Sequence, residues 1–231
     1  MKYKHLFFDL DHTLWDFERN SSESLLEIFE RFELAGHGVT SCDEFIGTFS
    51  RINLALWKAF DQGTYTHTYI RENRFRMVFE EMGLVAPTCC SELGECYLEL
   101  LPQKKYLLEG ALDVLDHAAG QGYVLHIVTN GFDHVQAKKM QNSGIFHYFT
   151  HIITNEKAQA KKPDPRIFAY ALELARARHE ECIMIGDNWE ADILGAKRFG
   201  LDTVYYNPLG LQYDEVPTHD IRHLHELKAI I

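Results

Sequence analysis

The chain has 231 residues, of which 46% are hydrophobic, and a formal net charge of −11. This length allows one well-packed core and a smaller second unit. The negative charge disfavours nucleic acid polymers and anionic membranes as partners, because both repel an acidic surface. The five cysteines show no zinc-binding spacing, and their odd number suits reduced thiols. No stretch approaches the ~20 apolar residues of a membrane span, so we expect a cytoplasmic protein.

The first predicted strand ends in acidic residues. The chain opens with Lys4-His5-Leu6-Phe7-Phe8-Asp9-Leu10-Asp11-His12-Thr13. Its apolar run predicts a buried parallel strand that ends in two carboxylates and a hydroxyl, those of Asp9, Asp11 and Thr13. Ligands of open α/β sheets bind at the carboxyl ends of the strands. Asp and Thr are also ordinary residues of turns and helix N-caps, so this string alone leaves both interpretations open.

The next segment, residues 20–101, has helical periodicity without a convincing strand pattern. Ser21 or Ser22 is suited to cap the first of four predicted helices. Alternation of strands and helices resumes near Gly110 and continues through an apolar strand at residues 202–206. We therefore expect a doubly wound, mostly parallel α/β sheet with a helical insertion. The expected boundaries are 1–16 and 105–231 for the core and 17–104 for the insertion.

A second predicted strand, residues 123–129, ends in Thr129 and is followed by an Asn130-Gly131 turn. Thr129 is therefore placed to donate a hydrogen bond at a strand end. Taken alone, Thr-Asn-Gly is more typical of an ordinary turn.

Two later motifs add a cation and further acids. Lys162 precedes a helix predicted from Pro165 through Arg178, with Asp164 as its N-cap. Residues 182–186 predict a third buried strand, and two acids follow it, Asp187 and Asp192. Each motif alone also fits a solvated loop or a helix cap.

Together these motifs supply what phosphoryl transfer needs, because a parallel sheet brings its strand ends to one edge. That chemistry requires an oxygen nucleophile, oxygen ligands for a metal, and cationic or hydrogen-bonding groups around a phosphate dianion. The set resembles the haloacid dehalogenase (HAD) superfamily. Its four motifs are matched in order by Asp9-x-Asp11-x-Thr13, Thr129, Lys162 and Gly186-Asp187-x-x-x-x-Asp192.

The resemblance implies a Rossmann-like core, a helical cap over the site, and specific roles. The nucleophile would be Asp9, and Asp11 would be the general acid and base. The dehalogenating branch lacks this second acid, so Asp11 favours a phosphatase. Thr129 and Lys162 would bind phosphate oxygens, helped by the amides of Leu10 and Asn130. Ligands for Mg²⁺ would come from Asp9, the Asp11 carbonyl and Asp187, and Asp192 would orient a metal-bound water or Lys162.

The predicted substrate is a small phosphate monoester. Asn53-x-x-Leu56-Trp57 and Arg74-Phe75 in the insertion, with Thr129-Asn130-Gly131-Phe132 in the core, resemble YjjG-type pyrimidine 5′-nucleotidases. This resemblance implies pyrimidine and deoxypyrimidine nucleoside 5′-monophosphates. Aromatic and arginine side chains would then meet the base by stacking and hydrogen bonding, although each aromatic also fits a place in the insertion's core. These candidates are Trp15, Phe17, Trp57, Arg74 and Phe75.

Three other functions remain open at this point. A sugar-phosphate or phosphoglycolate phosphatase would share every catalytic residue. A phosphomutase would return the phosphoryl group to its substrate and release no inorganic phosphate. A noncatalytic binding protein is disfavoured, because keeping buried like charges without a metal or substrate costs stability.

Overall fold

The computed structural model describes residues 2–231. The chain divides into two compact units, one made of Met1–Phe17 and Lys105–Ile231 and the other of Glu18–Lys104. The first unit holds the sheet and the second is helical. These limits lie within one residue of the expected domain boundaries.

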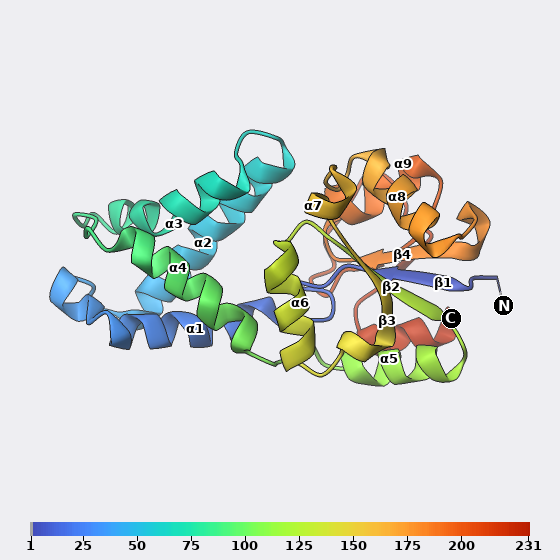
Figure 1. Ribbon diagram of the computed structural model, residues 1–231, viewed down its shortest axis with the longest axis horizontal. Coiled ribbons are helices and arrows are strands. Elements are labelled where there is room, and N and C mark those ends of the chain that lie inside the picture. Colours follow the sequence, from blue (N-terminus) through green and yellow to red (C-terminus); the bar gives the residue numbers. More distant parts are fainter. Residues whose placement is uncertain (1) are drawn as a thin grey trace. The chain divides into compact units, whose positions relative to one another are not determined.

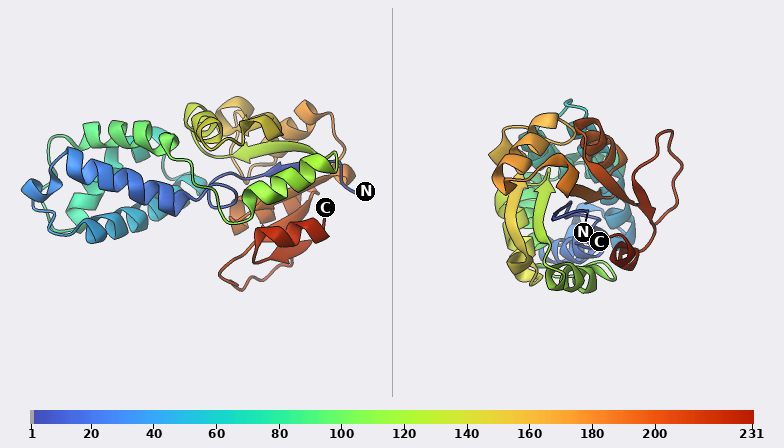
Figure 2. Two further views of the ribbon diagram at one scale, coloured as in Figure 1. Left: turned by 90° about the horizontal axis from the view of Figure 1, so that it is seen from below. Right: turned by 90° about the vertical axis from the view of Figure 1, so that its right-hand side faces the viewer.

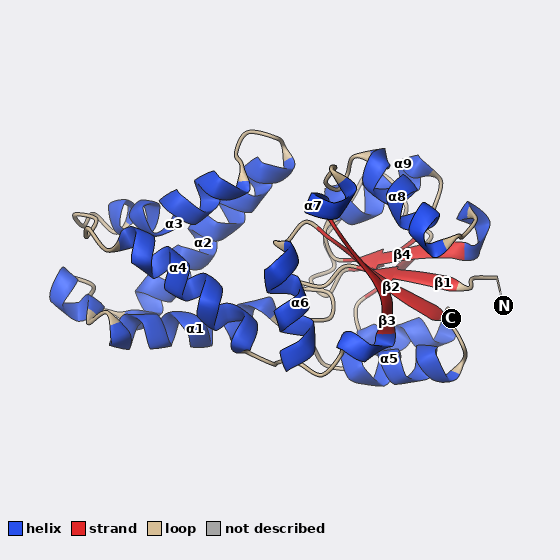
Figure 3. Cartoon of the chain, in the orientation of Figure 1, coloured by secondary structure: helices blue, strands red, loops and turns tan. Residues whose placement is uncertain are grey.

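The first unit is built on a parallel sheet (Figure 3). Within residues 2–231 it has six strands in the order β3-β2-β1-β4-β5-β6, and every neighbouring pair is parallel. The strands are β1 (His5–Phe8), β2 (Val124–Thr129), β3 (Phe149–Thr154), β4 (Cys182–Gly186), β5 (Asp202–Tyr206) and β6 (His219–Ile221).

This strand order is that of the doubly wound Rossmann-like fold, which confirms the predicted fold class. The central strand β1 lies between β2 and β4, and the strand order changes direction between β1 and β4. In such sheets ligands bind outside the carboxyl ends of the strands at that switch point. The loops after β1 and β4 are therefore the expected place for a site.

Helices cover both faces of the sheet (Figure 1). One face is packed by α8 (Pro165–Ala175) and α9 (Gly195–Phe199), and the other carries α5 (Ala111–Gly120). Helix α6 (Asp133–Asn142) follows β2 in the sequence, and α7 (Asn155–Ala158) follows β3. Under α8 and α9 lies a buried core with residues from four strands and both helices, including Phe7, Val128, Met184, Phe168 and Ala196.

Two features of this unit differ from expectation. Helix α8 begins at Pro165 with Asp164 as N-cap, as predicted, but it ends at Ala175 rather than Arg178. Arg176 takes a left-handed conformation with φ of 50° and terminates the helix. Strands β3 and β6 were not predicted from the sequence.

The second unit contains four α-helices (Figure 2), and the first of them begins one residue before the unit, at Phe17. They are α1 (Phe17–Arg31), α2 (Cys42–Asp61), α3 (His67–Glu81) and α4 (Cys90–Leu100), and α3 packs against both α2 and α4. Ser41 and Thr66 cap α2 and α3 by accepting backbone hydrogen bonds. The prediction of Ser21 or Ser22 as a cap was wrong, because α1 already begins at Phe17. Ser21 instead lies buried and hydrogen-bonds Tyr97 at 2.8 Å.

All five cysteines are free thiols in the structure. Within residues 2–231, none of the helices is both long and apolar enough to cross a bilayer.

Candidate active site

The predicted site residues of the core unit gather at the carboxyl edge of the sheet. Asp9 directly follows β1, Thr129 is the last residue of β2, and Asp187 directly follows β4. The chain then turns sharply after β1: His12 takes a left-handed φ of 62°, and the Leu10 carbonyl accepts hydrogen bonds from two later amides. The regular strand therefore ends at Phe8, and the position of Asp11 is set by the loop rather than by the strand.

Lys162 connects three parts of this edge. Its ammonium lies 2.6 Å from an oxygen of Asp9 and 2.6 Å from an oxygen of Asp192, and it donates to the Val128 carbonyl at 2.7 Å. The side chain is buried. Although burial by itself lowers the pKa of Lys162, the Asp192 and Asp9 carboxylates outweigh it and raise that pKa, so Lys162 is a fixed cation. Asn130 holds the Lys162 backbone in place by two hydrogen bonds.

The loop after β4 brings Asp192 back to the strand end. A π-helical turn spans Trp189–Leu194, and Asn188 caps it by accepting from the Ala191 amide at 3.0 Å. Asp192 lies against Gly186: a β-carbon there would stand 2.3 Å from the Asp192 carboxylate. A glycine is therefore required at this position to admit the acid. Both Asp192 oxygens have partners, Lys162 and the Asn188 amide.

Three carboxylates crowd this edge in a way that suits a hard cation. Oxygens of Asp9, Asp187 and Asp192 all lie within 4.8 Å of one another. Burial raises the pKa of Asp9 to about 7, with Lys162 opposing and Asp192 adding to the rise. Burial also raises the pKa values of Asp187 and Asp192 to about 6, and the negative charge of a neighbouring carboxylate contributes to each. Mg²⁺ prefers oxygen ligands, carboxylates among them, so these residues fit such an ion.

Asp187 is also held by the loop after β1, because Thr13 donates a hydrogen bond to it at 3.1 Å. The first and fourth motifs are thereby connected by a buried hydroxyl. One Asp187 oxygen accepts this bond, which orients the carboxylate toward Asp9 and Asp192.

Asp11 has partners that the sequence analysis missed. Lys139 contacts both of its oxygens, at 2.6 and 2.9 Å, and Gln136 donates to it at 2.9 Å. Both partners come from α6 and are buried. They share a helix face with Val135 and Met140, and that pattern of polar residues on an apolar face was a usable signal.

Thr129 is oriented by the same helix. Its hydroxyl oxygen accepts hydrogen bonds from the Gln136 side chain at 2.8 Å and from the Gly131 amide at 3.1 Å. Because both bonds use its lone pairs, the hydroxyl hydrogen remains as the group that can donate to a ligand. The assignment of Leu10 and Asn130 amides to phosphate oxygens stays a prediction.

The residues predicted to select the substrate lie in different settings. Trp15 is buried in the core unit, with the Lys139 ammonium 4.4 Å from its ring centre. Phe75 is buried in the helical unit, and the Arg74 guanidinium donates to Asn53 at 3.0 Å within that unit. Trp57 is only partly buried and packs edge-on against Phe60. Their contact with a substrate stays a prediction.

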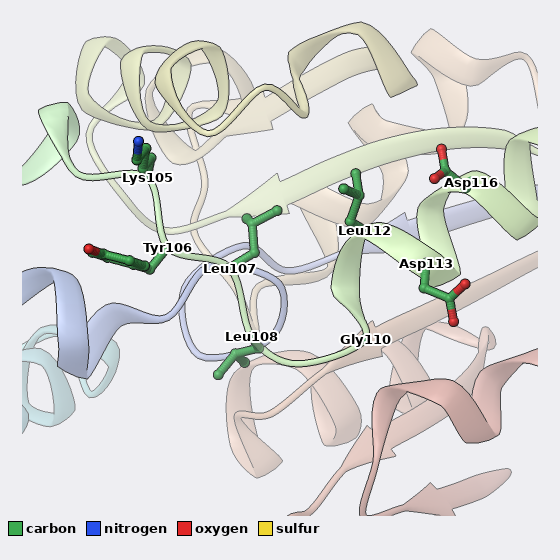
Figure 4. A pocket seen from close by; sticks show the side chains of 8 residues that line it. All are labelled: Lys105, Tyr106, Leu107, Leu108, Gly110, Leu112, Asp113 and Asp116. Atoms are coloured by element: carbon green, nitrogen blue, oxygen red, sulfur yellow. The ribbon is translucent and has the colours of Figure 1, made fainter.

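A separate pocket lies in the core unit where the chain enters α5 (Figure 4). Its lining comes from residues 105–116 and includes Tyr106, Leu112 and Asp113. Among the residues that the structure describes, none of the predicted site residues lines it. We assign it no part in the chemistry.

Comparison with known proteins gives the class. The family model of haloacid dehalogenase-like hydrolases matches residues 3–200. The chain therefore belongs to the HAD-like hydrolase family, as its fold and acidic strand ends indicate.

The relatives refine this class. The HAD-hydrolase YfnB of Bacillus subtilis strain 168 is 32% identical over 100% of this chain and 96% of its own length. A crystal structure of YfnB bound to magnesium has a TM-score of 0.88 over 100% of this chain and 99% of that one. Two pyrimidine 5′-nucleotidases are similar: PynA of Streptococcus pneumoniae R6 (31% identity, 96% of this chain, 92% of PynA) and YjjG of Escherichia coli K12 (30%, 100% and 99%).

Proposed function

We propose that this hydrolase is a Mg²⁺-dependent phosphomonoesterase that acts through an aspartyl-phosphate. The observation that carries this proposal is the pair of carboxylates after β1, each held by its own buried lysine: Asp9 by Lys162 and Asp11 by Lys139. An esterase of this type needs two acids in different roles, one that bonds phosphorus and one that exchanges a proton.

In the first step an Asp9 oxygen forms a bond to phosphorus as the bond to the ester oxygen breaks. Asp11 gives its proton to that departing oxygen, which leaves as an alcohol. In the second step a water oxygen bonds phosphorus, the Asp9–phosphorus bond breaks, and Asp11 takes the water proton. Inorganic phosphate leaves, and both side chains return to their initial state.

Neighbouring groups bind the phosphoryl oxygens. Lys162 supplies a fixed positive charge and Thr129 a hydroxyl donor, and both are held by the surrounding backbone and side chains. Mg²⁺, when bound by Asp9, Asp187 and the Asp11 carbonyl, would offset the repulsion between the carboxylates and the phosphate dianion. Asp192 keeps Lys162 in position.

We further propose pyrimidine nucleoside 5′-monophosphates as the substrates. Support comes from the two nucleotidases, which are about 30% identical over nearly the whole chain. The helical unit would provide the discrimination, because the core residues contact only the phosphate and its leaving oxygen.

Phosphate release across a substrate panel tests this proposal. The panel contains pyrimidine and purine monophosphates, sugar phosphates, phosphoglycolate and p-nitrophenyl phosphate, each with Mg²⁺ and with a chelator. We expect Mg²⁺-dependent release, fastest from pyrimidine monophosphates. Faster release from sugar phosphates would assign the enzyme to that class, and no release from any ester would refute the esterase.

A further inference from the structure

Helix α6 presents two buried polar residues to the site, and the reaction scheme above gives neither of them a task. Lys139 and Gln136 are three residues apart on this helix, so they lie on one face. Only 2% of Lys139 and none of Gln136 is exposed to solvent. Burying such groups costs free energy, and a buried ion pair is weak support for stability. A contribution to stability therefore does not explain why Lys139 and Gln136 are buried here.

Lys139 fixes the Asp11 carboxylate from one side. The ammonium contacts both oxygens, at 2.6 and 2.9 Å, which sets the plane of the carboxylate. The Lys139 ammonium also lies 4.4 Å from the centre of the Trp15 ring and 5.5 Å from the centre of the Phe17 ring, within the range of a cation–π contact. The lysine therefore has little freedom to follow a carboxylate that rotates.

Gln136 fixes the same carboxylate from a second direction. Its amide nitrogen donates to Oδ2 of Asp11 at 2.9 Å and to the Thr129 hydroxyl at 2.8 Å. The amide lies in a space that only a glycine leaves free: a β-carbon on Gly131 would stand 2.5 Å from the Gln136 carboxamide. Gln136 thus connects the general acid to the residue at the end of β2.

These contacts treat the two oxygens of Asp11 differently. Oδ2 accepts from both Lys139 and Gln136, whereas Oδ1 accepts from Lys139 alone. A carboxylate oxygen can accept about two hydrogen bonds in its plane. Oδ1 is therefore the oxygen that retains a lone pair for the substrate.

We propose that Lys139 and Gln136 are positioning residues that hold Asp11 so that Oδ1 meets the leaving oxygen of the ester. This inference rests on the proposed phosphatase function. The proton passes from Oδ1 to the leaving oxygen as the phosphorus–oxygen bond breaks, and Oδ1 later receives the proton of the attacking water. Lys139 and Gln136 keep their own protons throughout.

The test compares two esters of similar size with different needs for a proton. Benzyl phosphate has an alkoxide leaving group that must be protonated, whereas p-nitrophenyl phosphate has a stable leaving anion. The measured quantity is kcat/KM, because it reports the first phosphoryl transfer. The variants are Lys139→Met, Gln136→Met, Lys139→Arg and Asp11→Asn, and the control is Lys138→Met, which changes an exposed lysine next to Lys139.

We expect Lys139→Met to lower kcat/KM for benzyl phosphate by about 10²-fold, within the range of general acid catalysis, and for p-nitrophenyl phosphate by less than about threefold. Gln136→Met should show a smaller loss with the same dependence on the leaving group. Lys139→Arg keeps the cation and should restore part of the benzyl phosphate activity. In the Asp11→Asn background, Lys139→Met should cause little further loss, because both changes remove one function.

Other outcomes would overturn the inference. Equal losses on both esters, or losses that add to those of Asp11→Asn, would mean that Lys139 acts through the fold or through another residue. Melting temperatures by circular dichroism show whether each variant is folded. If Lys139→Met does not fold, Gln136→Met tests the positioning of the same carboxylate through its other oxygen, Oδ2. A wild-type protein active on both esters keeps the phosphatase assignment in either case. A wild-type protein inactive on both would refute the phosphatase and this inference together.

Discussion

The acidic side chains at this edge release their protons less readily than free carboxylic acids do. Three carboxylates here have raised pKa values, and two of them, Asp9 and Asp192, contact Lys162, whose pKa is also raised. Such an arrangement is expected where function, rather than stability, selects the residues. The repulsion among these carboxylates is relieved when a cation joins the cluster.

The nucleophile gives the first prediction. Asp9→Asn should abolish phosphate release and leave the fold intact, because an amide has nearly the shape of a carboxylate but is a poor nucleophile. Phosphate release and thermal melting measured on the same preparation test this. A folded variant with near-wild-type turnover would refute covalent catalysis by Asp9.

The second prediction concerns pH and the metal. The Asp187 carboxyl ionises near pH ~4 in an unfolded chain, whereas its pKa in the folded protein is about 6. The folded state therefore binds more protons between these values, and the metal-free protein loses stability as the pH rises through them. Asp187→Asn removes this loss, so in chelator the variant should melt above wild type at about pH 8, and the difference should shrink toward about pH 4.

Mg²⁺ should reverse this order. An ion that binds only the folded state at 100 times its Kd adds about 2.7 kcal/mol to the free energy of unfolding. We expect saturating Mg²⁺ to raise the melting temperature of wild type and to have little effect on Asp187→Asn. Equal Mg²⁺ shifts in the two proteins would remove Asp187 from the metal site.

At the scale of elements, the site depends on close approaches between loops. Gly186, the last residue of β4, leaves room for the Asp192 carboxylate. Gly186→Ala should displace Asp192 from Lys162 and lower kcat/KM by about tenfold or more, since misplacement by an ångström can cost about 10²-fold. Gly120→Ala is the matched control, because a β-carbon there meets no atom within 4 Å. Comparable activity in both variants would show that the β4 loop tolerates the added methyl.

Much of the element pattern follows from local sequence. The strands that carry Asp9, Thr129 and Asp187 are apolar runs that end in polar residues, so their ends were predicted correctly. Strand β3 was missed because Thr150 and His151 interrupt its apolar residues, and its burial pattern follows neither strict alternation nor a continuous buried run. It lies at the edge of the sheet, where such a sequence is tolerated. Strand β6 has three residues, too few for any pattern.

The partners of Asp11 show what the sequence could not predict. Lys139 lies 128 positions from Asp11 and Gln136 lies 125 positions from it. Only the parallel pairing of β1 with β2 brings α6 to this acid. A motif search finds the reacting acids, whereas the groups that orient them depend on packing between distant segments.

At the scale of the whole molecule, two units divide the proposed tasks, with reaction in the core and selection in the helices. Trp57 and Arg74 allow this division to be tested. Trp57→Ala should lower kcat/KM for pyrimidine monophosphates by about tenfold or more and leave p-nitrophenyl phosphate nearly unchanged, because stacking on a base is worth roughly 1–3 kcal/mol. Equal losses on both substrates would give Trp57 a packing role.

Arg74→Ala should behave differently. The guanidinium bonds Asn53 and lies 4.4 Å from the Tyr97 ring centre, both within the helical unit. Its loss leaves a buried amide oxygen unpaired, at a cost of about 1–3 kcal/mol. We expect a lower melting temperature and similar changes on both substrates. A selective loss on nucleotides with unchanged stability would instead assign Arg74 to the base.

The central claim is that Asp9 carries the phosphoryl group during hydrolysis, and trapping that bond tests it most directly. The enzyme turning over a pyrimidine monophosphate with Mg²⁺ is quenched in acid and reduced with borohydride, which converts an aspartyl-phosphate to homoserine. Peptide mass spectrometry then identifies the modified residue. We predict homoserine at position 9 only when substrate is present, and none in Asp9→Asn. Rapid phosphate release with unmodified Asp9, or modification of another acid, would contradict the mechanism.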